Sequence, residues 1–283
     1  MVEQPQARMF FPVDIRRRRS TEAERYFRLI FEKQSSRWGY GEVNPVRHEV
    51  TDPVKMAQEV KEKALSLGAS LVGITTVTQD HVFQGHDVLE KYLISLAMEM
   101  DHDRIATAPS AKSGAEAARV YYELGEVTIR LADYIRSLGY PAYAHHPLGA
   151  GRLVQVPYAI AAGLGEQGRN GIIITPQFGP RVRLGSVSTN LPLAIDEPRH
   201  WGIGAVCEKC QVCFKACPTE AIPTERGMDR GISHFAIDWQ KCFPYFAEYY
   251  GCAICLKVCP FSRNPGKRFE DKLTALKKKL LVA

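Results

Sequence analysis

Apolar residues recur at helical spacing in two stretches of the chain. Asp52-Pro53 opens the first stretch as an N-cap followed by proline at the first helical position, and Gly68 closes it. The second begins at Ser113, which forms a capping box with Glu116, and ends just before Gly139. The apolar stripe of this second predicted helix should face a core and consists of Ala117, Val120, Tyr121, Leu124, Thr128, Leu131, Ile135 and Leu138.

Shorter apolar runs predict strands. Ser70–Thr76 is typical of a buried strand. Gly171–Thr175 and Arg181–Thr189 are joined by the turn-forming segment Pro176–Pro180, so we expect them to be adjacent strands of one sheet. Phe269–Leu281 predicts a short basic amphipathic helix.

Composition divides the chain into three predicted parts. Residues 1–48 are polar, basic and aromatic without clear period and predict an arm over the core, residues 49–200 form that core, and residues 201–283 contain short loops and all the cysteines. A hydrophobic content of 45% is ample for an ordinary core. No apolar run approaches the roughly 20 residues that span a bilayer.

Charge is concentrated near the two ends of the sequence. Arg16–Arg19 is similar to a twin-arginine export signal, but the polar segment Ser20–Arg25 follows where such a signal needs an apolar stretch. We therefore expect a cytoplasmic protein without an export signal. The net charge is +6, but the basic segments contain no interleaved aromatic residues and no recognition motif. Nucleic-acid binding is therefore not expected.

All eight cysteines lie between positions 207 and 259. The first four, followed by Pro218, form C-x2-C-x2-C-x3-C-P, a run that gives three thiolates to one 4Fe-4S cluster and the fourth to a second cluster. The predicted ligand sets are therefore Cys207, Cys210, Cys213 and Cys259 for one cluster, and Cys217, Cys242, Cys252 and Cys255 for the other. We call these the first and second cysteine sets.

Disulfides and structural zinc sites are the alternative uses of these cysteines. Disulfide frameworks are typical of small secreted chains. Some 200 residues of this chain contain no cysteine, which argues against such a framework here. Zinc sites usually come as two separated CxxC pairs. One irregularity is the nine-residue gap between Cys242 and Cys252, where a ferredoxin has two residues.

Several ordered blocks carry a resemblance to a known family. They are Ala97–Ser110, Leu131–Tyr140, the glycine-rich stretch and strands from Ala162 to Leu184, Thr189–Leu193, and then the cysteines. These blocks resemble the cobalamin-dependent reductive dehalogenases and, more distantly, the epoxyqueuosine reductases. The segment formed by Gly165-Glu166 and Gly168–Gly171 resembles the corresponding segment of the dehalogenase branch. The chain would be a short form without the export signal of respiratory members.

The resemblance implies an α/β (α+β) fold with two parts. A nitroreductase-like core would hold a corrinoid, cobalamin with its nucleotide base off the cobalt, beside a ferredoxin-like domain with two 4Fe-4S clusters. It implies reductive removal of halide from an organohalide, with a reduced ferredoxin, flavodoxin or reductase as the electron donor. Backbone contacts to the flat ring are expected from Gly163, Leu164, Gly165, Gly168, Arg169, Asn170 and Gly171. A tight turn without a ligand is the alternative for this segment.

Two residues of the family's pocket can be placed by the same resemblance. A tyrosine near the start of the long helix would donate the proton, and we prefer Tyr122 over the alternate Tyr121, because Tyr121 lies on the core stripe. A basic residue would stabilise the phenolate, and we assign Arg181 with Arg183 as its alternate. His145-His146 is not expected to bind cobalt, because the base-off mode needs no protein ligand.

Two other functions remain open from the sequence. One is a cobalamin-dependent reductase of a non-halogenated substrate such as epoxyqueuosine in transfer RNA. The other is an electron-transfer iron-sulfur protein without a corrinoid.

Overall fold

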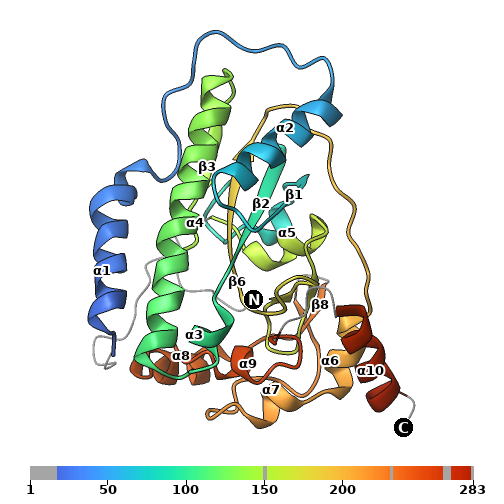
Figure 1. The fold of residues 1–283 in the computed structure, drawn as a ribbon. Coiled ribbons are helices and arrows are strands. Elements are labelled where there is room, and N and C mark those ends of the chain that lie inside the picture. Colours follow the sequence, from blue (N-terminus) through green and yellow to red (C-terminus); the bar gives the residue numbers. More distant parts are fainter. Residues whose placement is uncertain (1–17, 149–151, 230–231, 264–268, 282–283) are drawn as a thin grey trace.

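A four-stranded antiparallel sheet forms the centre of the protein (Figure 1). The computed structural model describes residues 18–148, 152–229, 232–263 and 269–281. The strand order is β1–β2–β6–β3, with β1 at Leu71–Thr76, β2 at Tyr92–Glu99, β6 at Val182–Thr189 and β3 at Ala142–His145. The long helix α4 (Ala111–Ser137) packs along this sheet.

The other elements are short and surround this pair of layers. The remaining α-helices are α1 (Thr21–Leu29), α2 (Pro53–Ser66), α3 (His102–Ile105), α5 (Gln155–Ala161), α6 (Ile203–Lys209), α7 (Val212–Lys215), α8 (Trp239–Glu248), α9 (Ile254–Lys257) and α10 (Phe269–Leu281). Single turns of π- or 3-10 helix are η1 (Ile30–Gln34), η2 (Ser35–Arg37) and η3 (Gln79–His81), and two small hairpins pair β4 (Glu166–Gln167) with β5 (Ile173–Ile174) and β7 (Gly227–Asp229) with β8 (Ile232–His234).

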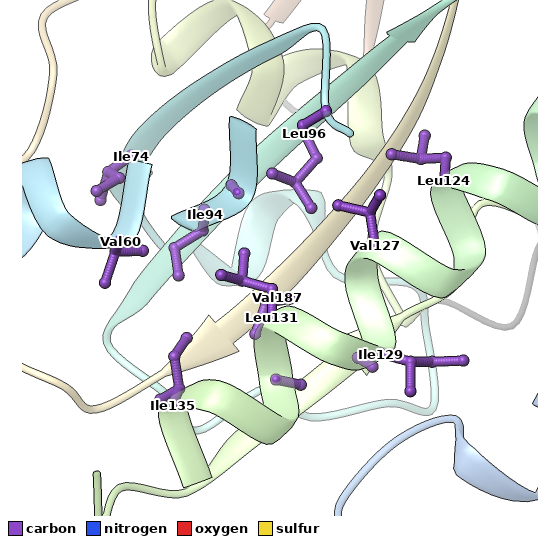
Figure 2. Packing of buried hydrophobic residues seen from close by; sticks show 14 of the residues in the cluster. Val60, Ile74, Ile94, Leu96, Leu124, Val127, Ile129, Leu131, Ile135 and Val187 are labelled. Carbon is purple, nitrogen blue, oxygen red and sulfur yellow. The ribbon is translucent and has the colours of Figure 1, made fainter. Parts of the chain in front are cut away.

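The main core lies between α4, α2 and the sheet. Figure 2 shows Leu131 and Ile135 of α4 near Ile94 and Val187 of the central strands, and all four are fully buried. Ile94 pairs with Val187 across β2 and β6, so the apolar faces of the two strands are in register beneath the helix. The predicted helical stripe therefore faces the core, except at Tyr121, which does not belong to this core.

Several predicted elements are confirmed, with one shifted boundary. Asp52 caps α2 through the backbone N–H groups of Val54 and Lys55, and the predicted strand corresponds to β1. Helix α4 ends before Gly139 but begins three residues earlier than predicted. Ser110 is its N-cap and shares a capping box with Ser113, because the Ser113 hydroxyl replaces the expected glutamate at that position.

The predicted pairing of two strands is wrong. Strand β5 pairs with β4, whereas β6 pairs with β2 and β3, and only an isolated bridge between Thr175 and Gly179 joins the two ends of the turn. Strands β2 and β3 come from distant parts of the chain, so local turn signals could not reveal that they, rather than β5, flank β6.

Helix α1 packs against α4 on the side away from the sheet (Figure 1). Ala23 lies against Ala115 and Ala118, and these small side chains allow the two helices to approach closely. The predicted arm is therefore helical in part, and its residues 1–17 lie outside the described residues. Within the described ranges, no helix has the length and apolarity required to cross a membrane.

Replacing Leu131 by alanine should lower the free energy of unfolding by about 2–5 kcal/mol. The side chain is fully buried between α4 and the sheet, so its removal leaves a cavity. Urea denaturation would measure the loss. The matched control Leu89→Ala removes a side chain that is 83% exposed and should stay within about 0.5 kcal/mol of wild type. Equal losses in the two variants would contradict the core described above.

Candidate active site

The first cysteine set converges on one small cavity. Helix α6 carries Cys207 and is followed by Cys210, helix α7 carries Cys213, and Cys259 follows α9. All four line the cavity together with Arg169, Asn170, Ile174, Gln211, Pro260 and Phe261. Cys259 thus joins three cysteines that lie more than forty positions earlier in the chain. Cys217 does not line this cavity of described residues.

The thiols of the second cysteine set lie close enough to influence one another electrostatically. Burial raises the pKa of the Cys255 thiol to about 12, with Cys252, Cys213, Cys242 and Cys217 adding to the effect. Burial also raises the pKa of Cys242, with further contributions from Cys252 and Cys217. The four cysteines of the second set therefore lie near one another, and the assignment of each set to its own cluster stays a prediction. Cys213, which influences Cys255, shows that the sets are neighbours.

Cys217 differs from the other members of its set because hydrogen bonds favour its thiolate. Burial raises its pKa, but the Thr219 hydroxyl and backbone N–H groups of Thr219, Ala221 and Ile222 outweigh burial, so the pKa is lowered. The Cys217 sulfur lies 3.6 Å from the Thr219 hydroxyl oxygen. A nest of neutral donors therefore surrounds this one sulfur.

The donor chemistry of both sets fits iron-sulfur clusters. Four cysteine thiolates are the usual ligands of a 4Fe-4S cluster, and each thiolate binds a different iron atom, so the sulfurs need not converge on one point. In the described ranges, no group of three or more His, Cys, Asp or Glu side chains is arranged to hold a single metal ion.

A larger cavity of about 340 Å³ lies between α4, β6, α1 and α8. Apolar and aromatic side chains form most of its wall. The lining residues are Arg18, Arg19, Ser20, Ala23, Phe27, Gly114, Ala117, Tyr121, Pro147, Leu148, Arg183, Phe243, Phe246, Ala247, Tyr250 and Gly251. We call it the Tyr121 cavity.

Tyr121 and Arg183 meet on one wall of the Tyr121 cavity. The guanidinium carbon of Arg183 lies 4.7 Å from the centroid of the Tyr121 ring, a cation–π contact. The Arg183 Nε is buried and has no hydrogen-bond partner among the described residues. An unpartnered donor at the edge of an apolar cavity is suited to a ligand that brings a hydrogen-bond acceptor.

Another part of the wall of the Tyr121 cavity comes from residues next to the second cysteine set. Phe243 directly follows Cys242, and Gly251 directly precedes Cys252. Helix α4 touches this loop through Gly114, where a Cβ atom would lie 2.4 Å from the Tyr250 carbonyl oxygen. The cavity is therefore lined both by the Tyr121–Arg183 pair and by residues next in sequence to two cysteines of the second set.

The preferred catalytic residues, Tyr122 and Arg181, lie elsewhere. The Tyr122 ring faces Tyr26 of α1, with ring centroids 6.1 Å apart. Arg181 is 3% exposed and binds the Glu99 carboxylate at 2.7 Å and the Ser262 carbonyl oxygen at 2.6 Å. Neither side chain lines the Tyr121 cavity of described residues. The structure brings together the two alternates and separates the two preferred residues.

The glycine-rich segment packs against the protein itself. A Cβ atom on Gly165 would lie 2.4 Å from the Ile174 carbonyl oxygen, and one on Gly163 would lie 2.7 Å from the Glu197 carbonyl oxygen. The missing side chains thus make room for neighbouring backbone in and beside the β4–β5 hairpin. Contact of this segment with a corrinoid stays a prediction. Gln167 does line a second hollow of about 600 Å³, together with Ala161 and Arg226.

The same segment fixes helix α6 at both ends. The Glu166 carboxylate accepts hydrogen bonds from the backbone N–H groups of Trp201, Gly202 and Gly204, at 2.9, 3.1 and 3.0 Å, near the start of α6. Arg169 donates to backbone carbonyls at its end. Glu166 and Arg169 therefore position the helix that carries Cys207.

The two histidines are neutral and engaged inside the core. His146 accepts a hydrogen bond from the Leu148 N–H at Nδ1, which leaves Nε2 as the donor to Gln34 Oε1 at 3.0 Å. His145 Nε2 lies 2.9 Å from the Ser188 hydroxyl oxygen, and its Nδ1 has no partner among the described residues. Neither lines the Tyr121 cavity.

The aromatic wall of helix α8 was not predicted from the sequence. Phe243 and Phe246 lie in the nine-residue gap between Cys242 and Cys252 that departs from ferredoxin spacing. The length of that gap was the only sign of this wall in the sequence, because nine residues between two cysteines leave room for additional structure.

Comparisons with known proteins support the same family as the motifs. A tetrachloroethene reductive dehalogenase of Desulfitobacterium hafniense is 43% identical over 136 residues, covering 48% of this chain and 24% of that protein. One from Sulfurospirillum multivorans is 30% identical over 249 residues, covering 72% of this chain and 49% of that protein. An epoxyqueuosine reductase of Listeria monocytogenes is 39% identical over 79 residues, 28% of this chain and 20% of that protein. No protein-family model matches.

Solved structures show the same fold. The catabolic reductive dehalogenase NpRdhA superposes with a TM-score of 0.82 at 23% identity, covering 90% of this chain and 39% of that chain. A reductive dehalogenase structure described as suggesting a mechanism for B12-dependent dehalogenation gives a TM-score of 0.74 at 23% identity, covering 92% and 38%. In sequence and in fold, the chain is therefore similar to reductive dehalogenases, and it is similar to epoxyqueuosine reductases over a shorter stretch. It spans about half or less of the length of these curated relatives.

Acidification should destabilise the protein through its buried histidines. Burial lowers the pKa values of His145 and His146 from 6.5 to about 3. Below pH 6.5 the unfolded chain therefore binds protons that the folded chain does not, and stability falls by about 1.4 kcal/mol per pH unit for each group. Denaturation between pH 7 and 4 would measure this slope. His146→Gln should reduce it, whereas the exposed His48→Gln should leave it unchanged; equal slopes in all three proteins would contradict this.

Proposed function

We propose that this protein is a corrinoid-dependent reductase that removes halide from an organohalide and receives its electrons through two 4Fe-4S clusters. The observation that carries the proposal is the Tyr121 cavity, which is lined by a tyrosine–arginine pair and by residues next in sequence to Cys242 and Cys252. The names of the relatives support the reaction class, and one similar structure is described as B12-dependent.

The cavity suits a flat and largely apolar ligand. Phe27, Phe243 and Phe246 supply aromatic surface, and a volume of about 340 Å³ lies in the range usual for ligand pockets. These residues would hold the substrate against one face of the corrinoid, whose ring extends beyond a cavity of this volume. Once bound, the corrinoid supplies cobalt reduced far enough to cleave a carbon–halogen bond.

The cysteine sets would deliver the electrons singly. The first set, with Arg169 beside it, would hold the cluster that a ferredoxin, flavodoxin or reductase reduces, and the second set would pass electrons toward the Tyr121 cavity. The overall reaction consumes two electrons and one proton, converts the carbon–halogen bond to carbon–hydrogen, and releases halide.

Tyr121 is placed to supply that proton. Its hydroxyl would donate to the carbon that loses halide, and the adjacent Arg183 guanidinium would stabilise the phenolate left behind. The Arg183 Nε has no hydrogen-bond partner among the described residues, so this N–H is available to the phenolate. Water from the bulk would reprotonate Tyr121 after turnover.

Tyr121→Phe should lower halide release by about 100- to 10,000-fold, because only the acidic hydroxyl is lost. The assay would use anaerobically reconstituted protein, a chemical one-electron reductant and a panel of chlorinated ethenes and halophenols. Cluster and corrinoid contents should match wild type.

Tyr122→Phe is the matched control for the proton donor. Its ring packs on Tyr26 outside the Tyr121 cavity, so the variant should keep nearly full activity. An inactive Tyr122→Phe beside an active Tyr121→Phe would restore Tyr122, the residue that the sequence favours, as the donor. Turnover of epoxyqueuosine in RNA without any halide release would move the protein to the other branch.

Neighbouring cysteines should belong to different clusters. Wild type should contain about eight iron and eight sulfide per chain, as two 4Fe-4S clusters require. Cys259→Ala should lose the first cluster and Cys255→Ala the second, although the two lie four positions apart. Iron analysis and electron paramagnetic resonance (EPR) would distinguish the two remaining signals. Loss of the same signal in both variants would contradict the crossed sets, and stoichiometric zinc would contradict the clusters.

A further inference from the structure

Arg169 is a buried cation beside the first cysteine set. Its side chain is 2% exposed and lines the same cavity as the four cysteines. Within the part of the chain that the structure describes, its hydrogen bonds go to backbone carbonyls and none goes to a carboxylate. A guanidinium removed from water without a counter-ion is costly, so its surroundings must compensate for the charge.

Carbonyl oxygens supply part of this compensation. Arg169 Nε donates to Cys207 O at 2.9 Å, Nη2 donates to Glu208 O at 2.6 Å, and Nη1 donates to Pro223 O at 3.0 Å and to Thr224 O. The first two acceptors lie in the last turn of α6, where carbonyls lack partners within the helix. The planar fork therefore ties the helix that carries Cys207 to the loop beyond it.

An aromatic ring face also helps to compensate for the Arg169 charge, but a net positive charge remains. The Arg169 guanidinium carbon lies 4.8 Å from the centroid of the Phe235 ring. Carbonyl dipoles and a ring face are neutral, so the site keeps one net positive charge beside four cysteines. A 4Fe-4S cluster with four thiolates is anionic in both oxidation states and gains one more negative charge on reduction. The cluster itself would thus be the missing counter-charge.

We propose that Arg169 positions the first cluster and raises its reduction potential, because its buried charge favours the reduced and more negative state. The inference rests on the proposed function, since it requires the cluster. Net charge and hydrogen bonding near the sulfurs are among the factors that set such potentials. Around Cys217 of the second set, the hydrogen-bond donors are neutral, so the effect of Arg169 should be confined to the first cluster.

Three variants separate charge from hydrogen bonding. Arg169→Gln removes the charge and the fork, whereas Arg169→Lys keeps the charge alone. Arg226→Gln is the matched control, because Arg226 also stacks on Phe235, at 4.4 Å, but pairs with Glu208 and does not line the cysteine cavity. Each protein would be reconstituted anaerobically with iron and sulfide and titrated potentiometrically with EPR detection.

Arg169→Gln should make reduction of the first cluster at least tenfold less favourable, a shift of about 59 mV to more negative potential for a one-electron couple. In Arg169→Lys the potential of the first cluster should move by less than half of the shift seen in Arg169→Gln. In Arg226→Gln this potential should equal that of wild type. The second cluster should be unchanged in all three. Loss of the first cluster in Arg169→Gln with retention in Arg169→Lys would equally support a role for the charge.

An unmoved potential in Arg169→Gln would overturn the inference, as would equal shifts in Arg169→Gln and Arg169→Lys. Either result can be obtained only if the wild-type protein holds two clusters. In that case the proposed function is not affected. A wild-type protein without any 4Fe-4S signal would overturn the proposed function and this inference with it.

Discussion

The rest of the structure depends on the buried contacts of Arg181, which fasten the cysteine-rich part of the chain to the sheet. Its guanidinium joins Glu99, at the end of β2, to the carbonyl oxygen of Ser262, three residues beyond Cys259. Because the Arg181 side chain is almost fully buried, losing Glu99 would leave its charge uncompensated. Gly179 allows the same approach, since a Cβ atom there would lie 2.0 Å from the Phe261 carbonyl oxygen. These contacts fix the segment around Cys259 relative to the sheet.

Local signals predicted what depends on local chemistry. Asp52, Gly68 and Gly139 marked helix ends correctly because capping is decided within a few residues. The cysteine spacing likewise grouped Cys259 with the first three cysteines, and all four line one cavity. The pairing of β6 with β2 and β3 was not accessible, because it depends on contacts between segments far apart in sequence.

The choice between adjacent candidates failed for a related reason. Helix α4 is covered on two sides, so a half-buried tyrosine can face either the Tyr121 cavity or α1, and the sequence did not show where α1 packs. Arg181 and Arg183 would share a face in a continuous strand, but β6 begins at Val182, which lets Arg181 turn toward Glu99 while Arg183 meets Tyr121. Whether Tyr121 or Tyr122 donates the proton is therefore a question of helix packing, which periodicity alone does not answer.

Equilibrium titration with cobalamin tests most directly whether the corrinoid binds at the Tyr121 cavity. Ala117→Trp would fill this cavity from α4, and Ala161→Trp would fill the second hollow beside the glycine-rich segment. We expect one cobalamin to bind per wild-type chain. Binding should be at least about tenfold weaker in Ala117→Trp, a loss of about 1.4 kcal/mol in binding free energy. Ala161→Trp should bind cobalamin as wild type does, and the iron content of all three proteins should be equal. Wild-type binding in Ala117→Trp together with weakened binding in Ala161→Trp would contradict binding at the Tyr121 cavity.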